Sequence, residues 1–338
     1  MNARIQSRTL AAFLGLLIAL TGCRDGDRSA TANEAPASQG LCVASDCGEA
    51  IPLVTIPDAE NILFLDDGRL IVSGGRNVYE ITGSLAAGFE ARPLSAQDCG
   101  FTGLAARYGH LYAVCGESRL FVAPLDAALA LAPVFEFADA CIPNGTVFGP
   151  DGHLYVVDEP LNPACGDELP KIMRLRIDPA QPTVVQAQET WLAGSTLGGL
   201  AFGTDTVMRF PNGLAIEGNR FWATDGGSVF YVDWQPDGQA GEIVPVFFEP
   251  TAHDDLSITD GTLLVTDFFG GRILQLATDG RVLQATAEAS FASPSAVMRG
   301  QPPLFSSDDI LVTEKGVLQD PDGPVGNLLT LFRRLPQE

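Results

Sequence analysis

Short apolar runs, bounded by turn residues, recur along the chain from residue 66 onward. Typical examples are LYVV (154–157) and LLVT (263–266), which are flanked by Gly and Asp. Runs of this length, rich in β-branched and aromatic residues, are typical of strands. No stretch keeps apolar residues at i, i+3 and i+4 over several turns, as an amphipathic helix would. We therefore expect an all-β protein.

The strand pattern is organised as a repeat of one phrase: a turn, a β-rich run, a small or acidic residue, a second turn and another β-rich run. The phrase occurs at 66–81, 107–125, 150–160, 217–233, 259–280 and 307–318. Equivalent apolar positions are spaced by 41, 43, 67, 42 and 47 residues and are Leu70, Leu111, Leu154, Phe221, Leu263 and Ile310. Four spacings match a propeller blade of about 40–50 residues. The long one predicts an insertion between Leu161 and Phe210.

Six repeats predict a six-bladed β-propeller of four-stranded antiparallel blades over residues 49–338. A single blade would leave both of its apolar faces exposed, so the ring has to close. We expect Ile51–Ile56 to supply a strand to the blade that ends with Asn327–Leu335. Two stacked β-sandwiches are the main alternative, but they do not predict six units of one spacing.

The first 22 residues have the pattern of a lipoprotein signal peptide. Arg4 and Arg8 form a basic region, and the apolar stretch Leu10–Leu20 is too short to span a bilayer as a mature helix. The following Leu-Thr-Gly-Cys resembles a bacterial lipobox, which implies cleavage before Cys23 and its acylation by fatty acids such as palmitate. An ordinary secretory signal followed by a chance cysteine is the alternative.

Residues 23–48 are expected to be the lipidated Cys and a flexible tether, because they are rich in polar residues and Ala and poor in large apolar ones. The residue after Cys23 is Arg24 and not Asp, which by the sorting rule of enterobacterial lipoproteins points to the outer membrane. We expect a monomer in the bacterial cell envelope, anchored to the membrane by its lipid.

The six cysteines that follow Cys23 are an even number, which suits an oxidising compartment. Proximity along the chain favours the pairs Cys42–Cys47, Cys99–Cys115 and Cys141–Cys165. A cysteine-based metal site is the weaker alternative, because the sequence contains no CxxC pair.

The chain is strongly acidic, with a formal net charge of −22. Phosphate binding needs clustered Lys and Arg, so we do not expect a nucleic-acid partner. The acidity fits both solubility outside the cell and cation binding, and it does not choose between them.

The innermost strand of each blade borders the central channel, so the residue at its start lies at one mouth of the channel. The six segments there are DAENILF, CGFTGLA, IPNGTVF, FPNGLAI, HDDLSIT and SPSAVM. Four of them have an oxygen ligand at matching positions: Glu60, Asn144, Asn212 and Asp254. Carboxylate and amide oxygens suit a hard divalent cation, above all Ca²⁺, with Mg²⁺, Mn²⁺ and Zn²⁺ as alternatives. The competing interpretation is that the two Asn-Gly pairs are plain turns and that Glu60 is a solvated loop residue.

Segments 209–233 and 253–283 resemble the gluconolactonase/regucalcin (senescence marker protein) family of calcium-dependent six-bladed propellers, which is related to paraoxonases and strictosidine-synthase-like proteins. The resemblance implies that the four oxygen side chains at the channel mouth hold the metal. Two departures are visible. Asp255 stands where the family has Gly and is a further candidate ligand, as in paraoxonases. Ile142 replaces an arginine, which argues against sugar-acid lactones as substrates.

The resemblance implies hydrolysis of a lactone or ester. A bound cation would polarise the carbonyl and lower the pKa of bound water, and Asp254 or His253 would be the general base. Neighbouring strand residues point to opposite faces, which weakens the case for using both. No GxSxG nucleophile elbow is present. The alternative is a non-catalytic, lipid-anchored binding or scaffold propeller, because a fold alone does not settle function.

Overall fold

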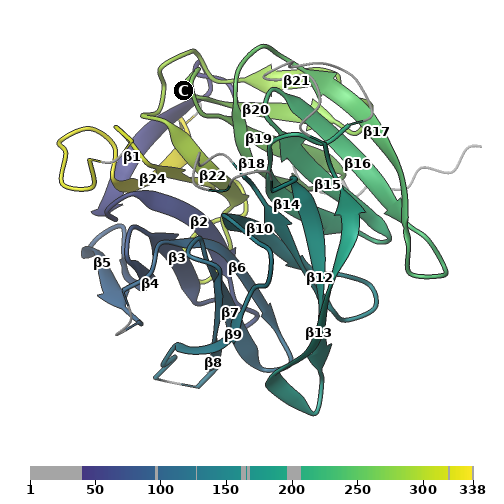
Figure 1. Ribbon diagram of the computed structural model, residues 1–338. Helices are drawn as coiled ribbons and strands as arrows, with labels where there is room; N and C mark the ends of the chain where they lie inside the picture. Colours follow the sequence, from purple (N-terminus) through teal and green to yellow (C-terminus); the bar gives the residue numbers. More distant parts are fainter. Residues whose placement is uncertain are drawn as a thin grey trace, which may run out of the picture. The chain divides into compact units, whose positions relative to one another are not determined.

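A computed structural model describes residues 40–95, 98–126, 128–160, 165, 168–195, 207–318 and 320–336. These residues form six four-stranded antiparallel sheets and no α-helix. The sheets are arranged as blades around a central channel (Figure 1). The all-β prediction and the six-bladed propeller are therefore confirmed. The predicted signal peptide and Cys23 lie outside the described residues.

Each of the first five blades takes its four strands in chain order, from the channel outward. Blades one and two are β2 (Ala59–Phe64), β3 (Leu70–Gly74), β4 (Asn77–Ser84) and β5 (Gly88–Pro93), then β6 (Phe101–Arg107), β7 (His110–Cys115), β8 (Arg119–Pro124) and β9 (Ala132–Glu136). Blade three is β10 (Pro143–Phe148), β11 (Leu154–Asp158), β12 (Lys171–Asp178) and β13 (Gln181–Ala193). Blades four and five are β14 (Pro211–Glu217), β15 (Arg220–Asp225), β16 (Ser228–Trp234) and β17 (Ala240–Phe248), then β18 (His253–Thr259), β19 (Thr262–Asp267), β20 (Arg272–Ala277) and β21 (Val282–Ala285).

The sixth blade closes the ring with the two ends of the domain. Its strands β22 (Pro294–Arg299), β23 (Ile310–Glu314) and β24 (Leu328–Arg334) are completed by β1 (Gly48–Thr55). Strand β1 pairs antiparallel with β24, with Ile51 opposite Leu331, as the sequence predicted. In Figure 1 the purple β1 lies beside the yellow β24. A sheet made from both chain ends ties the first blade to the last.

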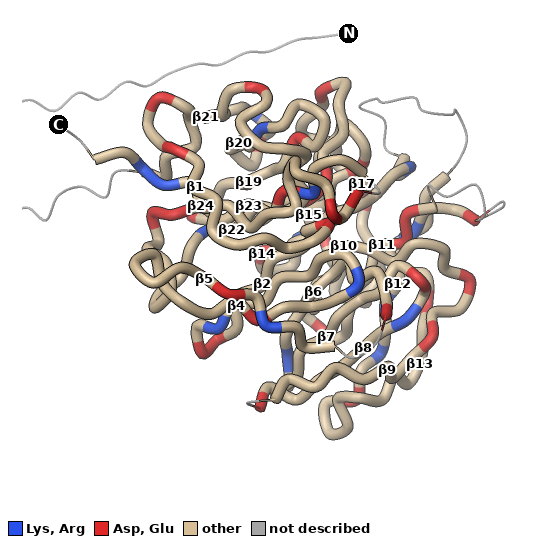
Figure 2. The backbone as a smooth tube through the Cα atoms, turned by 90° about the vertical axis from the view of Figure 1, so that its left-hand side faces the viewer, with Lys and Arg blue, Asp and Glu red and all other residues tan. Residues whose placement is uncertain are grey.

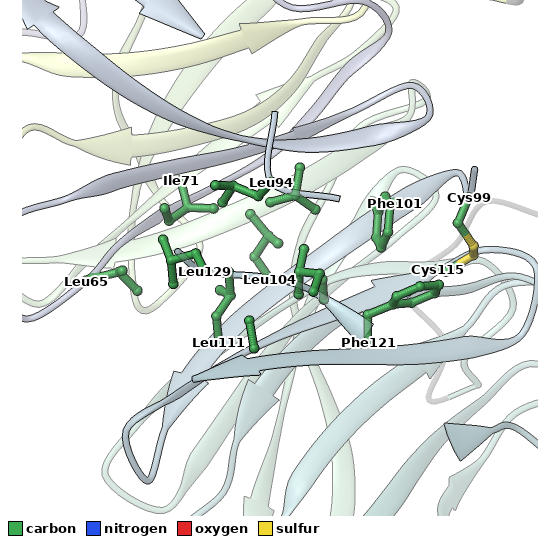
Figure 3. Packing of buried hydrophobic residues seen from close by; sticks show 14 residues of the cluster. Leu65, Ile71, Leu94, Cys99, Phe101, Leu104, Leu111, Cys115, Phe121 and Leu129 are labelled. Carbon is green, nitrogen blue, oxygen red and sulfur yellow. A yellow bond between two sulfur atoms is a disulfide. The ribbon is translucent and has the colours of Figure 1, made fainter. Parts of the chain in front are cut away.

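The apolar core lies between neighbouring blades. The second strand of a blade is covered on both faces, so every residue of β3, β11 and β23 is buried. Between blades one and two, Ile71 of β3 packs in one cluster with Leu104 of β6 and Phe121 of β8 (Figure 3). The rings of Phe101 and Phe121 meet edge to face at 5.0 Å. Burial of apolar area between blades, and not within one blade, therefore stabilises the ring.

The tether is shorter than predicted. Leu41, Cys42 and Val43 are buried against blades five and six, and the Val43 N–H donates to Gln284 Oε1 at 3.0 Å. The packed domain thus begins at about Leu41 and not at residue 49. Three apolar residues gain enough burial to fix this segment, although its overall composition is that of a linker.

All three predicted disulfides are formed: Cys42–Cys47, Cys99–Cys115 and Cys141–Cys165. The second joins the loop before β6 to the end of β7, and the third joins the loop before β10 to the segment after β11. Glu117 lies close to the Cys99 and Cys115 sulfurs, but these are bonded to each other, so the group is not a metal site. Two disulfides therefore fasten loops at the channel mouth that contains the candidate site.

Part of the predicted insertion forms the long outer strand β13, which has 13 residues. Residues 161–164, 166–167 and 196–206 of the insertion lie outside the described part. No helix among the described residues is long and apolar enough to cross a bilayer. In Figure 2, Lys and Arg (blue) are scattered among Asp and Glu (red) on the side shown.

Candidate functional site

The six inner strands all start at the same mouth of the channel, and the predicted ligands occupy the same position in each. The second residues of these strands are Glu60, Thr102, Asn144, Asn212, Asp254 and Ser295. Every inner strand has a register irregularity at this point. A bulge breaks the strict alternation of side chains, so the second and third residues of the strand can both face the channel. The structure therefore brings the four predicted oxygen ligands to one place.

The two Asn-Gly pairs are not turns. Asn144 lies inside β10 and Asn212 inside β14, and neither residue nor the Gly that follows it has a positive φ. The glycines are needed for space. A Cβ on Gly145 would lie 2.2 Å from the Asn212 carbonyl oxygen, and one on Gly213 would lie 2.4 Å from Asp255 Oδ1. The competing interpretation of these pairs as plain turns is thus wrong.

Hydroxyl groups in the second strands fasten one inner strand to the next. Thr224 Oγ1 accepts the Gly213 N–H at 2.8 Å and donates to the Asp254 carbonyl at 2.7 Å. Thr313 Oγ1 donates to the Glu60 carbonyl at 2.8 Å. Each of these threonines therefore holds the backbone of a predicted ligand in the neighbouring blade, which limits the movement of that ligand.

The predicted ligands line a cavity of about 440 Å³ at the channel mouth. Two further charged residues line it, Glu159 and Lys315. Glu159 Oε2 accepts the Nδ2 groups of Asn144 at 3.3 Å and of Asn212 at 3.4 Å, and Asn212 Nδ2 also contacts Asp254 Oδ1. Because the amide nitrogens face carboxylates, both amide oxygens are available to a cation. We refer to Glu60, Asn144, Asn212, Asp254, Glu159 and Lys315 as the ring.

Lys315 lies within the ring as an ammonium among carboxylates. Its Nζ forms an ion pair with Glu60 Oε2 and lies 3.9 Å from Asp58 Oδ1. Burial opposes its charge, but the carboxylates around it, Glu60 first, raise the pKa of Lys315 above its ordinary value. Lys315 is therefore a cation at neutral pH.

Sequence reasoning missed Glu159 and Lys315, although both lie at equivalent positions. Each directly follows the second strand of its blade, β11 and β23. The corresponding residues of the other blades are Gly75, Gly116, Gly226 and Phe268. A comparison of this second position across the six repeats would have identified the two charges.

The acidic residues one position earlier have a structural role. Asp158 Oδ1 accepts the N–H groups of Cys141 and Ile142 at 2.8 and 2.9 Å, and Glu314 Oε2 accepts the Ala292 N–H at 2.6 Å. These carboxylates support the loops that lead into the inner strands. The recurring acid of the repeat thus shapes the mouth and does not line the cavity.

The ring is short of positive charge. Burial raises the pKa of Glu159 to about 8. Burial and then the nearby Glu60 carboxylate raise the pKa of Asp254 well above its usual range, and the pKa of Glu60 is also raised, mainly by burial. Burial in low dielectric and like-charge repulsion both disfavour ionised carboxylates, and a divalent cation relieves both effects. The donor set and its electrostatics fit a hard cation.

Asp255 faces a different part of the channel. It lines a second cavity, of about 600 Å³, formed by the remaining length of the inner strands. Its Oδ2 accepts Asn61 Nδ2 at 3.0 Å, and burial raises the pKa of Asp255 to about 7. Asp255 is not one of the described residues that line the ring cavity.

His253 also lines the ring cavity, but it has no orienting partner. It is buried, its ring lies 5.5 Å from that of Phe247, and burial lowers its pKa, so the imidazole is neutral. Within the described part, neither ring nitrogen has a hydrogen-bond partner. Its catalytic role stays a prediction, as does that of Asp254, which is a member of the ring and contacts Asn212 Nδ2.

Much of the remaining lining of the same cavity is apolar. Its large apolar side chains are Ile142, Phe210, Phe268, Phe269 and Leu318. Phe269 is 73% exposed, and its ring meets Phe268 edge to face at 5.4 Å. Leu318 of the same lining is 54% exposed, so two large apolar side chains of this cavity are open to solvent.

Solved structures show where this fold has been seen before. A gluconolactonase from Xanthomonas campestris aligns with a TM-score of 0.61 at 14% identity, covering 89% of this chain and 99% of that one. A luciferin-regenerating enzyme aligns at 0.61 and 14% identity, covering 85% and 95%. The calcium-binding protein regucalcin from Agrobacterium tumefaciens aligns at 0.57 and 12% identity, covering 83% and 90%.

These likenesses place the chain structurally among gluconolactonase- and regucalcin-type six-bladed propellers, and at such identities they show the fold alone. No protein-family model matches the sequence, and no curated protein matches it. The residues of the ring therefore carry the evidence about activity.

Proposed function

We propose that this protein is a divalent-cation-dependent hydrolase of lactones or esters. Glu60, Asn144, Asn212 and Asp254 would hold the cation, most suitably Ca²⁺. The observation that supports this most strongly is the convergence of four oxygen side chains, at one position of four inner strands, in a single cavity at the channel mouth. A neighbour described as calcium-binding and one described as a gluconolactonase share the fold.

The residues divide the chemistry between them. A bound cation would supply positive charge at the carbonyl oxygen, where negative charge develops during acyl transfer. Asp254 lines the same cavity, and its carboxylate is the candidate to accept a proton from the attacking water. Glu159 holds the Nδ2 groups of Asn144 and Asn212 and so orients both amide oxygens.

The apolar part of the cavity lining favours a substrate with an apolar substituent over a sugar-acid lactone. Ile142, Phe268 and Phe269 offer no hydrogen bond to sugar hydroxyls, and an apolar group would cover the exposed Phe269 ring.

We also propose that the protein acts in the cell envelope as a lipid-anchored lipoprotein. Its three disulfides suit an oxidising compartment.

The test combines cation binding with turnover. Wild type, Asn212→Ala and Asp254→Asn are compared for the Ca²⁺-dependent shift in Tm and for hydrolysis of aryl esters and alkyl lactones. The exposed Asn219→Ala is the matched control. A Ca²⁺ concentration 100 times Kd should stabilise the wild type by about 2.7 kcal/mol. Both ring variants should lose the shift and the turnover. Turnover that survives in both would reject this site, and no shift or turnover in the wild type would favour the non-catalytic binding propeller.

A further inference from the structure

Lys315 is one of only two lysines in the chain, and it is placed where a cation would have to bind. Its side chain is 19% exposed and its Nζ pairs with Glu60 Oε2, whose side chain is 8% exposed. A second carboxylate, Asp58, lies 3.9 Å away and is 35% exposed. The ammonium therefore has one acceptor inside the ring and one nearer to solvent.

We propose that Lys315 is an internal counter-ion that competes with the divalent cation for Glu60, and that cation binding transfers its ammonium to Asp58. This inference rests on the proposed cation site. It goes further by assigning Lys315 as the residue that sets the affinity of that site.

Electrostatics requires the competition. A divalent cation held by Glu60 would share that carboxylate with the ammonium, and like charges brought together in a buried site repel each other strongly. The pair Lys315–Glu60 compensates one carboxylate in the cation-free protein, so binding must first give up that compensation. The lysine thus stabilises the cation-free ring and lowers the affinity for the cation.

Asp58 is suitably placed to receive the ammonium. It lies two residues before Glu60, and its backbone N–H donates to Asn327 Oδ1 at 2.6 Å, which fixes this part of the loop. Lysine has a flexible four-carbon stem and three donors, so a short movement of Nζ can exchange one carboxylate for the other. Asp58 is also the more exposed of the two and can hold the ammonium at a smaller desolvation cost.

The first measurement is the Kd for Ca²⁺ by calorimetry in wild type, Lys315→Met and Asp58→Asn. A coupling of the usual size predicts binding about tenfold tighter in Lys315→Met. Asp58→Asn should bind more weakly than wild type, because the ammonium has lost its second acceptor. Arg176→Met is the matched control, since Arg176 is an exposed cation that pairs with Glu189 and does not line the ring cavity. Its Kd should not change.

The second measurement observes the ammonium directly in the wild-type protein. Protein labelled with [ε-¹³C]lysine gives two side-chain signals, which Lys171→Met assigns. Addition of Ca²⁺ should shift the Lys315 signal and leave that of Lys171 in place. The shift should be smaller in Asp58→Asn, where the transfer has no acceptor.

The outcomes separate this inference from the proposed function. Suppose that wild type and Lys315→Met bind Ca²⁺ with the same Kd, and that the Lys315 signal does not move. This result would overturn the competition but leave the cation site standing. Tighter binding in Lys315→Met with no effect of Asp58→Asn would support competition and reject Asp58 as the second acceptor. Absence of Ca²⁺ binding in both wild type and Lys315→Met would overturn the cation site and this inference together.

Discussion

Lys315 of the last blade pairs with Glu60 of the first, across 255 positions of the chain. The two residues meet only because β1 completes the sixth blade and closes the propeller. The cavity therefore depends on closure, and the residues that hold the closing strand are as important to the site as the ligands.

Weakening the closure should destabilise the whole propeller. Leu331 is fully buried and pairs with Ile51 of β1. Leu331→Ala removes buried methyl groups and leaves a cavity, so we expect a loss of about 2–5 kcal/mol in the free energy of unfolding. Denaturant titration measures it, with the exposed Leu335→Ala on the same chain end as the control. A loss no larger than that of the control would mean that closure contributes little.

The close approach of neighbouring inner strands gives a second prediction. A Cβ on Gly145 would lie 2.2 Å from the Asn212 carbonyl oxygen, so Gly145→Ala must displace the backbone of a predicted ligand. We expect a loss of about 1–3 kcal/mol in stability together with weaker Ca²⁺ binding. In Gly100→Ala the nearest atom would be 3.8 Å away, and neither quantity should change. Normal Ca²⁺ affinity in Gly145→Ala would show that the ring tolerates movement of Asn212.

The raised pKa values predict how the cation-free protein responds to pH. The pKa of Glu159 is about 8 in the folded protein and near 4.5 when unfolded, so between these values the folded state binds more protons. Stability in chelator should therefore fall as pH rises from 4.5 to 8, by at most about 1.4 kcal/mol per pH unit for one group. Glu159→Gln should flatten the fall, while Glu168→Gln, outside the ring, should not. Equal slopes in both variants would contradict the assignment.

The same linkage makes Ca²⁺ binding stronger at higher pH. Carboxylate ligands must be deprotonated, so binding of the cation should release protons from the ring. Calorimetry in buffers of different ionisation enthalpy measures this release. No proton release at pH 7 would mean that the ring carboxylates are already ionised before the cation binds.

The fold could be predicted because its signal is periodic. Six copies of one phrase occur, four of their five spacings match one blade length, and each copy contains a second strand bounded by turns. The ligand positions could be predicted for the same reason, since equivalent positions of a closed ring must meet. Glu159 and Lys315 were missed because the comparison stopped at the first strand of each blade. Nothing in composition marks them, and Lys315 has a partner that is 255 residues away.

Other features follow from local geometry that a sequence does not express directly. The alternation used to separate His253 from Asp254 fails, because β18 is irregular between His253 and Leu256, and both residues line the cavity. The same irregularity places Asp255 in the second cavity. The predicted tether extends too far toward β1. The few apolar residues at its end have little effect on the composition of a segment that is mostly polar.

The apolar mouth predicts a dependence on the length of the substrate's apolar group. Phe269 is 73% exposed beside the ring cavity, so a longer acyl or alkyl group can cover it, whereas an acetyl group is expected to reach it less well. Across acetyl, butyryl and hexanoyl aryl esters, kcat/KM should rise in the wild type. Phe269→Ser should lower the value for the hexanoyl ester by about tenfold, and hardly change that for the acetyl ester, because a pocket's discrimination by one or two methylenes is of this size. Phe269→Leu keeps an apolar side chain and is the matched control that should retain most of the slope. A slope that Phe269→Ser leaves intact would place the specificity elsewhere in the mouth, with Leu318 the next residue to change.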